Sequence, residues 1–169
     1  MLSNVKDELN RFAKYVISQS RANLTRGKKN SSKELYNSLK SNLNVSPNSF
    51  GLKFLMEDYG VFQDKGVSGK KVKYNTPFSY KDKMPPPSKL DKWIVRKGLK
   101  GTRDKEGRFI SRKSLQFMIA RSIFNKGIKP SMFFTKPFKK AFDNLPKDIV
   151  EAYKLDVEEL IKYTTNGNN

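Results

Sequence analysis

Two short runs of alternating apolar residues constrain the fold of this chain more than any other feature. The apolar members of the two runs are Leu39, Leu43, Val45, Phe50, Leu52, Phe54 and Met56. Pro47-Asn48-Ser49 separates the runs. Alternation with a period of two is typical of strands that bury one face, and a short turn between two such runs predicts an antiparallel β-hairpin.

Amphipathic helical patterns flank this hairpin on both sides. The first predicts a helix from Ser3, which is suited to be its N-cap, to about Thr25. The second predicts a final helix that begins near Pro146 and ends before a disordered tail at 164–169. The expected buried stripe of this final helix consists of Ile149, Tyr153, Val157, Leu160 and Ile161. We therefore predict an α+β fold, with a small, mainly antiparallel sheet flanked by N-terminal and C-terminal helices, as a single domain over residues 1–169.

A long basic insertion, residues 66–110, interrupts this framework. Its first part alternates lysines with aromatic residues over residues 70–83. Such a pattern fits either a platform on which single-stranded nucleic acid stacks or an edge strand with one buried face. Its second part contains a short helix at residues 90–97, in which Trp93 is expected to face the core. A loop at residues 99–110 follows and carries further basic side chains.

The net charge of +19 is concentrated in the middle of the chain. Residues 60–140 contain 22 Lys and Arg against 5 Asp and Glu, whereas residues 141–169 contain 3 against 6. Such a concentration of positive charge favours a polyanionic partner, and nucleic acid above all, because neutralising phosphates releases counterions. The alternatives are a solvated basic surface, or charge that keeps subunits soluble until they assemble.

The residues that most enzymes need are missing. The chain contains no cysteine and no histidine, which removes thiolate metal sites, imidazole ligands and the commonest general base. The carboxylates near the basic region show no metal-binding spacing, so we expect no enzymatic activity, no metal and no cofactor. No stretch approaches the roughly 18 consecutive apolar residues of a membrane span, so we expect no membrane partner.

Three stretches, in order, resemble the head-tail joining or tail-completion (neck) proteins of tailed bacteriophages. Residues 32–39 are similar to a Thr-Gly-x-Leu-x-x-Ser-Ile pattern, with Leu35 and Ser38 in register. Residues 59–66 are similar to Tyr-Ala-x-x-x-Glu-x-Gly, matched by Tyr59, Gly60, Asp64 and Gly66. The third stretch, residues 87–141, is similar to the helical and closing Pro-Phe-Leu-x-Pro-Ala patterns, matched by Trp93, Phe133, Phe134 and Pro137. The chain departs from the family pattern in three ways. It has Gly60 where the pattern has Ala and Asp64 where the pattern has Glu, and it contains a long insertion at residues 67–87.

This resemblance implies a structural virion protein that forms a ring of six or twelve copies at the portal-tail junction. Its partners would be portal or adaptor proteins, tail proteins and the double-stranded DNA that passes through the ring. The protein would reside in the host cytoplasm before assembly and in the virion afterwards. The basic residues expected to face the DNA channel or a neighbouring ring are Lys70, Lys71, Lys73, Arg103, Lys105 and Arg108. The alternative function is a non-specific nucleic-acid-binding protein that acts as a monomer or dimer.

Overall fold

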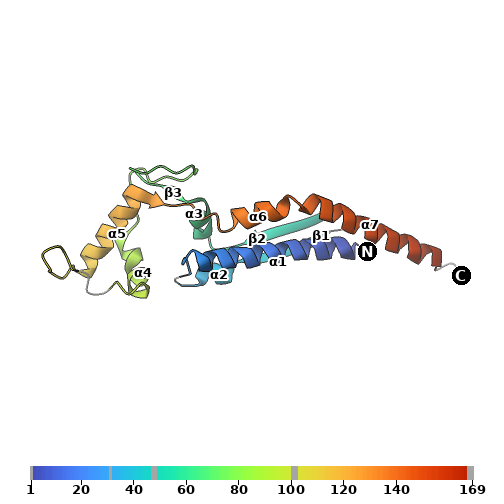
Figure 1. Cartoon of the computed structure of the whole chain (residues 1–169), viewed down its shortest axis with the longest axis horizontal. Helices are drawn as coiled ribbons and strands as arrows, with labels where there is room; N and C mark the ends of the chain where they lie inside the picture. Colours follow the sequence, from blue (N-terminus) through green and yellow to red (C-terminus); the bar gives the residue numbers. More distant parts are fainter. Residues whose placement is uncertain (1, 31, 47–48, 100–102, 167–169) are drawn as a thin grey trace. The chain divides into compact units, whose positions relative to one another are not determined.

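The structure is a computed structural model that describes residues 2–30, 32–46, 49–99 and 103–166. The chain divides into two compact units (Figure 1). Unit 1 consists of Met1–Arg26, Tyr36–Met56 and Phe133–Asn169, and unit 2 consists of Gly27–Leu35 and Glu57–Met132. The sequence predicts one domain over residues 1–169, whereas the structure separates two units, because the central segment has packed helices of its own. The α+β fold class is confirmed.

Unit 1 contains three helices and a hairpin. Helix α1 (Ser3–Arg26) matches the predicted bounds and packs against α6 (Thr135–Phe142), α7 (Leu145–Asn166) and the hairpin. Strand β1 (Lys40–Ser46) pairs antiparallel with β2 (Ser49–Leu55), so the predicted hairpin is confirmed. Figure 1 shows the hairpin running alongside α1 and α6. The short helix α2 (Glu34–Ser38) precedes the hairpin.

A cluster of phenylalanine rings joins the hairpin to the helices of unit 1. Phe54 of β2 makes edge-to-face contacts with Phe12 of α1 and with Phe134 and Phe138, at centroid distances of 5.3–6.0 Å. Phe138 also stacks on Phe142 at 5.6 Å. The alternation in β2 explains the cluster, because Phe50, Leu52 and Phe54 are partly buried while the residues between them are exposed. The buried face of β2 is therefore the face that the sequence predicts. In β1 the prediction holds less well, because Leu43 is partly buried but Val45 is 51% exposed.

The first turn of α1 is capped by a side chain from α7. The Asp156 carboxylate accepts hydrogen bonds from the backbone N–H groups of Asn4 at 3.0 Å and Val5 at 3.1 Å, and from the Asn4 side-chain amide at 3.0 Å. The Ser3 hydroxyl donates to the same carboxylate at 3.4 Å. Ser3 is therefore the first helical residue and not the predicted N-cap, since the acceptor that the free N–H groups need comes from α7.

The predicted buried stripe of α7 is only partly correct. Tyr153, Leu160 and Ile161 are 44–55% exposed, whereas Ile149 and Val157 are half-buried. The α7 residues that are buried are Ala152 and Asp156, which the prediction did not include. The helix also extends to Asn166, so residues 164–166 are helical where the sequence predicts disorder; 167–169 lie outside the described residues.

Unit 2 contains short elements arranged around the helix α5 (Arg112–Lys126). Its other elements are α3 (Tyr59–Lys65), β3 (Val67–Ser68), the 3-10 helix η1 (Pro87–Leu90), α4 (Asp91–Arg96) and β4 (Gly127–Ile128). Strands β3 and β4 pair antiparallel, and η1 packs against α5. Ser111 caps α5, because its hydroxyl accepts the Ser114 N–H at 3.1 Å. At the same end of α5, Arg112 donates two hydrogen bonds of 2.6 Å to Asp91 of α4.

Candidate functional site

The short helix α3 is fixed in unit 2 by contacts with the segment that follows β4. The Asp64 carbonyl accepts the Met132 N–H at 2.9 Å and the Ser131 N–H at 3.1 Å. The Ser131 hydroxyl also donates to the Gln63 carbonyl at 2.5 Å. Asp64 itself is buried. The second and third stretches of the family resemblance are therefore in direct contact.

Gly66, which ends α3, occupies a position that only glycine tolerates. Its φ is +76°, and a Cβ atom built there would lie 2.6 Å from the Ile128 carbonyl oxygen and 2.6 Å from the Pro130 ring. The left-handed conformation disfavours any other L-residue, and the close approach of β4 leaves no room for a side chain. The glycine of the resemblance therefore has a structural role that the sequence alone does not reveal.

Tyr59 connects α3 to the first stretch of the resemblance. Its hydroxyl has hydrogen-bond contacts with the Ser32 side chain and the Leu35 backbone. Burial, reinforced by the nearby Glu34 carboxylate, raises the pKa of the Tyr59 hydroxyl above its ordinary value. Leu35 and Gly60 are both buried. All three stretches of the resemblance are thus represented around α3.

Four further residues of the resemblance lie in unit 1. Ser38 is half-buried at the end of α2. Phe133 is almost fully buried, and its carbonyl accepts the Asn23 side-chain amide at 3.1 Å. Phe134 belongs to the phenylalanine cluster, and Pro137 is buried in α6.

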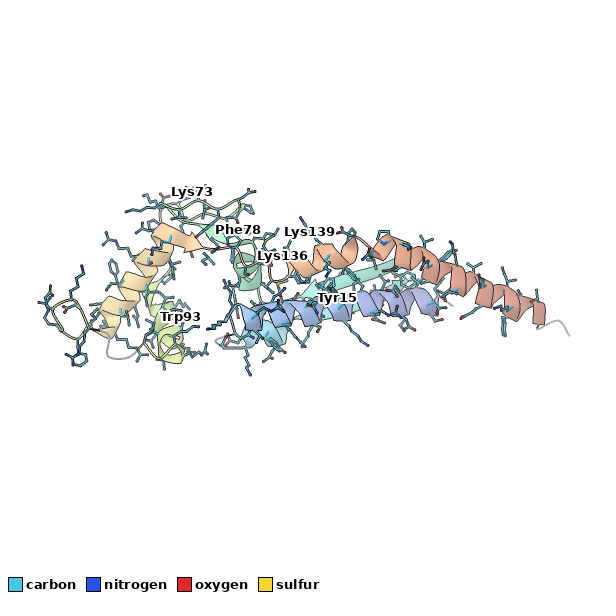
Figure 2. All side chains as sticks on the ribbon, in the orientation of Figure 1. Tyr15, Lys73, Phe78, Trp93, Lys136 and Lys139 are labelled. Atoms are coloured by element: carbon cyan, nitrogen blue, oxygen red, sulfur yellow. The ribbon has the colours of Figure 1, made fainter. Side chains whose placement is uncertain are left out.

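The prediction that Trp93 lies in the core is wrong. Its side chain is 39% exposed, whereas its neighbour Ile94 is only 3% exposed. Successive residues of a helix point about 100° apart, so a helix as short as α4 cannot bury both. Figure 2 shows Trp93 on α4.

Trp93 lines a pocket that we call the basic-aromatic pocket. This pocket has a volume of about 460 Å³ and is contained within unit 2. Its lining residues are Gly27, Lys28, Lys29, Ser32, Glu34, Tyr59, Gln63, Trp93, Arg96 and Lys97. Four cations thus face one carboxylate, Glu34, which lies 3.8 Å from the Arg96 guanidinium. Two aromatic rings supply the apolar part of the wall.

Two groups that line the basic-aromatic pocket have unusual surroundings. Partial loss of water around the Lys29 ammonium lowers the Lys29 pKa, although the residue is exposed. The side-chain nitrogen of Gln63 is buried and has no hydrogen-bond partner among the described residues, which is costly for a donor. The sequence analysis did not single out Lys29, Arg96, Lys97 or Gln63, and the only signal was the density of lysine around them.

Lys70, Lys71 and Lys73 lie in a loop that is tied to the end of α5. The backbone N–H groups of Lys70 and Lys71 donate to the carbonyls of Phe124 and Asn125, both at 2.9 Å. The Lys70 ammonium also lies 5.9 Å from the centroid of the Phe124 ring. All three lysine side chains are exposed, and Figure 2 labels Lys73 on this loop.

The aromatic residues that alternate with these lysines pack inside unit 2. Phe78 contacts Phe62 of α3 with a centroid distance of 4.7 Å, and Tyr80 contacts Phe124 of α5 at 6.2 Å. Ser68 of β3 forms an isolated parallel bridge with Ser79. The sequence left open a stacking platform or an edge strand with one buried face. The structure shows the partly buried face but no strand over residues 70–83.

Arg103 and Arg108 are engaged within their own loop. The Arg103 guanidinium lies 3.9 Å from the centroid of Phe109 and donates to the Gly107 carbonyl at 2.7 Å. Arg108 pairs with Asp104 at 2.8 Å and with Glu106 at 2.5 Å. Hydrogen bonds from Arg108 lower the pKa of the Asp104 carboxyl. Lys105 is exposed, with no salt bridge among the described residues.

The six predicted basic residues therefore form two groups and not one surface. One group contacts the end of α5, and the other lies in the loop that precedes its N-cap Ser111. Helix α5 has 15 residues, which at about 1.5 Å per residue separates its ends by about 22 Å. The two groups could contact different phosphates of one duplex, but they could not hold the same one.

The described residues contain no metal site and no membrane-spanning helix. No group of three or more Asp or Glu side chains among them could hold a metal ion. Within the same residues, no helix is both long and apolar enough to cross a membrane. No protein-family model, curated protein or solved structure matches this chain.

Proposed function

We propose that this chain is a structural subunit of a tailed-bacteriophage neck or tail-completion ring, which joins head to tail and surrounds the DNA channel. One observation carries the proposal: the stretches that resemble this family are far apart in sequence but meet around α3. Tyr59 contacts Ser32 and Leu35 of the first stretch, and Asp64 accepts hydrogen bonds from Ser131 and Met132 of the third. The three stretches therefore contribute to one local structure around α3.

The exposed stripe of α7 supports an oligomer. A helix that leaves Tyr153, Leu160 and Ile161 about half exposed gains stability when another surface covers them. Ring subunits need such surfaces, because a head-to-tail interface joins two different patches of the same chain. We propose six or twelve copies, with portal or adaptor proteins on one side, tail proteins on the other, and a location in the virion after assembly in the host cytoplasm.

The basic residues suit weak contact with the backbone of passing DNA. Lys70, Lys71 and Lys73 are exposed, whereas Arg103 and Arg108 would first have to leave their carboxylate and carbonyl partners. Contacts limited to the three lysines would give a plot of log affinity against log salt concentration with a slope of about −3, at roughly 0.9 per phosphate. Such contacts fix no sequence, so a duplex could slide past them.

The direct test is electron microscopy of phage particles produced from the genome that encodes this chain. We expect density for the chain as a closed ring at the portal-tail junction. Particles that lack the chain would contradict the proposal.

The DNA role is tested with a variant in which the six predicted basic residues are changed to serine. We expect particles that assemble but retain or eject DNA abnormally. The control removes the same number of positive charges from unit 1 by changing Lys6, Lys14, Lys40, Lys53, Lys136 and Lys139 to serine. If the first variant retained and ejected DNA normally, the six residues would have no role in the channel, although the ring could still exist.

A nucleic-acid-binding protein that acts alone is the second candidate, and the charge of unit 2 favours it. Unit 2 contains 22 Lys and Arg against 8 Asp and Glu, whereas unit 1 contains 13 against 8. This candidate predicts that the isolated monomer binds DNA with sub-micromolar affinity and a salt slope well beyond −3. Weak binding with a shallow slope would favour the ring subunit instead.

A further inference from the structure

One side of α5 carries positive charges and aromatic rings in alternation. Phe117 is 47% exposed, and the exposed cations Lys113 and Arg121 lie four residues before it and four residues after it. Residues four apart in a helix share one side. Phe124 follows Phe117 by seven residues and therefore points within about 20° of it. The Lys70 ammonium lies 5.9 Å from the centroid of the Phe124 ring and continues the row beyond the end of the helix.

We call Lys113, Phe117, Arg121, Phe124 and Lys70 the α5 row. All five belong to unit 2. From Lys113 to Phe124 the row is about 16 Å long at about 1.5 Å per residue, which matches about five nucleotides at a spacing of about 3.4 Å along a stacked strand. Phe124 is half-buried and contacts Tyr80, so Phe117 is the more open of the two rings.

The cations of the α5 row have no carboxylate partner among the described residues. Helix α5 contains no Asp and no Glu. Unit 2 has eight carboxylates, and five of them are occupied elsewhere. Asp64 is buried, and salt bridges with arginines outside the row involve Glu34, Asp91, Asp104 and Glu106. The row therefore presents positive charge that is not neutralised, and such charge attracts a polyanion.

The ring between the cations selects the kind of polyanion. An exposed aromatic ring flanked by cations binds a nucleobase by stacking, while the cations contact the phosphates on either side of that base. An unpaired strand can offer the face of a base to Phe117. A duplex cannot, because each base face is covered by its neighbours, so it would contact Lys113 and Arg121 and leave the ring unused.

We propose that the α5 row binds single-stranded nucleic acid, with one base stacked on Phe117 and the neighbouring phosphates contacted by Lys113 and Arg121. Lys70 contacts a further phosphate at the other end of the row. This contact fixes no base sequence, since every base has an aromatic face. The activity goes beyond the proposed ring, which surrounds duplex DNA, and does not rest on it.

The test measures the affinity of the full chain for a fluorescein-labelled thymidylate dodecamer by fluorescence anisotropy. The reference ligand is an abasic strand of the same length, which carries the same phosphates but no bases. Stacking of one base on an aromatic ring is worth about tenfold in affinity. We therefore expect the wild type to bind the thymidylate strand about tenfold more tightly than the abasic strand. This comparison needs no variant.

Substitutions at position 117 identify the ring. Phe117→Ala should remove the preference for the thymidylate strand and leave the affinities for the abasic strand and for a duplex of the same length unchanged. Phe117→Trp should keep the preference, because the indole ring also stacks. The matched control Met118→Ala removes a side chain that is 54% exposed on the same helix but points about 100° away from Phe117, and it should keep the preference too.

A pair of charge variants tests the phosphate contacts. Lys113→Gln combined with Arg121→Gln should make the plot of log affinity against log salt concentration shallower by about 1.4, at about 0.7 per phosphate of a single strand. The control combines Lys89→Gln with Lys92→Gln, which removes two exposed charges from η1 and α4. Helix α4 contacts α5 through Gln116, about 100° away from Phe117, so the control should leave the slope unchanged.

Three results would overturn the proposal: equal affinity of the wild type for the two strands, equal losses in Phe117→Ala and Met118→Ala, or an unchanged slope when Lys113 and Arg121 are replaced. None of these results depends on assembly. A chain that forms the ring but does not prefer the thymidylate strand would refute this inference alone. A chain that shows the preference but is absent from phage particles would refute the ring alone.

Discussion

Asp156 gives the sharpest prediction about stability, because one carboxylate closes the first turn of a helix from another element. It accepts the backbone N–H groups of Asn4 and Val5 and is itself only 7% exposed. Removing it in Asp156→Ala leaves two N–H groups and the Asn4 amide without their acceptor. Loss of a helix cap costs about 1 kcal/mol, and hydrogen bonds to a charged group contribute about 1.5–3 kcal/mol. We expect a total loss of about 3 kcal/mol in the free energy of unfolding.

The isosteric variant Asp156→Asn separates charge from shape. Burial raises the energy of the Asp156 carboxylate, but the hydrogen bonds from Asn4, Val5 and Ser3 outweigh this effect and lower its pKa. A carboxyl group with a lowered pKa stabilises the folded state above its ordinary pKa of about 3.9. This stabilisation is lost as the pH falls through the folded-state pKa. The difference between the wild type and Asp156→Asn should therefore be constant from about pH 7 to about pH 5 and shrink below about pH 4.

The assay is urea unfolding followed by far-ultraviolet circular dichroism at several pH values. At neutral pH we expect Asp156→Asn to lose about 2 kcal/mol, which corresponds to a fall of about 4–8 °C in Tm for a chain of this size. Amide hydrogen exchange should accelerate at the first turn of α1. Glu158→Gln is the control, because it removes an exposed carboxylate from the same helix. A loss that does not change with pH, or a loss equal to that of Glu158→Gln, would refute the reasoning.

Three further substitutions test the packing, each by equilibrium unfolding. Gly66→Ala should lower the free energy of unfolding by about 3 kcal/mol, because the left-handed backbone and the close β4 backbone both oppose a side chain. The control Gly107→Ala should lower it by only about 1 kcal/mol, because Gly107 has a φ of +79° but open space around it. Equal losses would contradict the steric argument. Phe54→Ala should cost about 2–3 kcal/mol, because it removes three ring contacts from a partly buried position, and a loss below about 1 kcal/mol would show that the cluster is not a core. Arg112→Ala should lower the free energy of unfolding by less than about 1 kcal/mol despite its two hydrogen bonds to Asp91, since both side chains are substantially exposed. Tryptophan fluorescence is the suitable probe, because the one tryptophan lies in unit 2. A loss above about 2 kcal/mol would contradict the expectation.

The parts of the fold that depend on local periodicity could be predicted from the sequence. The hairpin followed from alternation around Pro47-Asn48-Ser49, and α1 followed from its stripe, because both patterns specify which residues must share a face. The C-cap Gly127 of α5, with a φ of +75°, also has a sequence signal in the Lys-Gly pair that ends the helix.

The parts that depend on the choice of partner could not be predicted. The α7 stripe shows that one side of the helix is apolar, but periodicity does not tell whether the chain itself covers that side. Trp93 and Ile94 are adjacent apolar residues, and only the packing of α4 decides which of them is buried. The contact between Asp156 and Val5 joins residues 151 positions apart, and no local pattern reports such a pair.

The candidate site was predicted in part. The density of lysine and arginine in the middle of the chain pointed to unit 2, but not to its division into two groups at the ends of α5. Local spacing did contain one usable signal, because Asp104 and Arg108 are four residues apart and pair in the structure. The basic-aromatic pocket combines residues from three separate segments, so only the folded chain could show it.

The discontinuity of unit 1 sets an order in which the protein can fold as the ribosome makes it. Unit 2 consists of Gly27–Leu35 and Glu57–Met132, so all of it is synthesised before α6 and α7. Asp156 follows Val5 by 151 residues, a delay of about 8–30 s at about 5–20 residues per second. During that time α1 has no cap and no α7 to pack against. A chain truncated before α7 would therefore leave unit 1 unfinished, which a cell's proteases can recognise before the product enters an assembly.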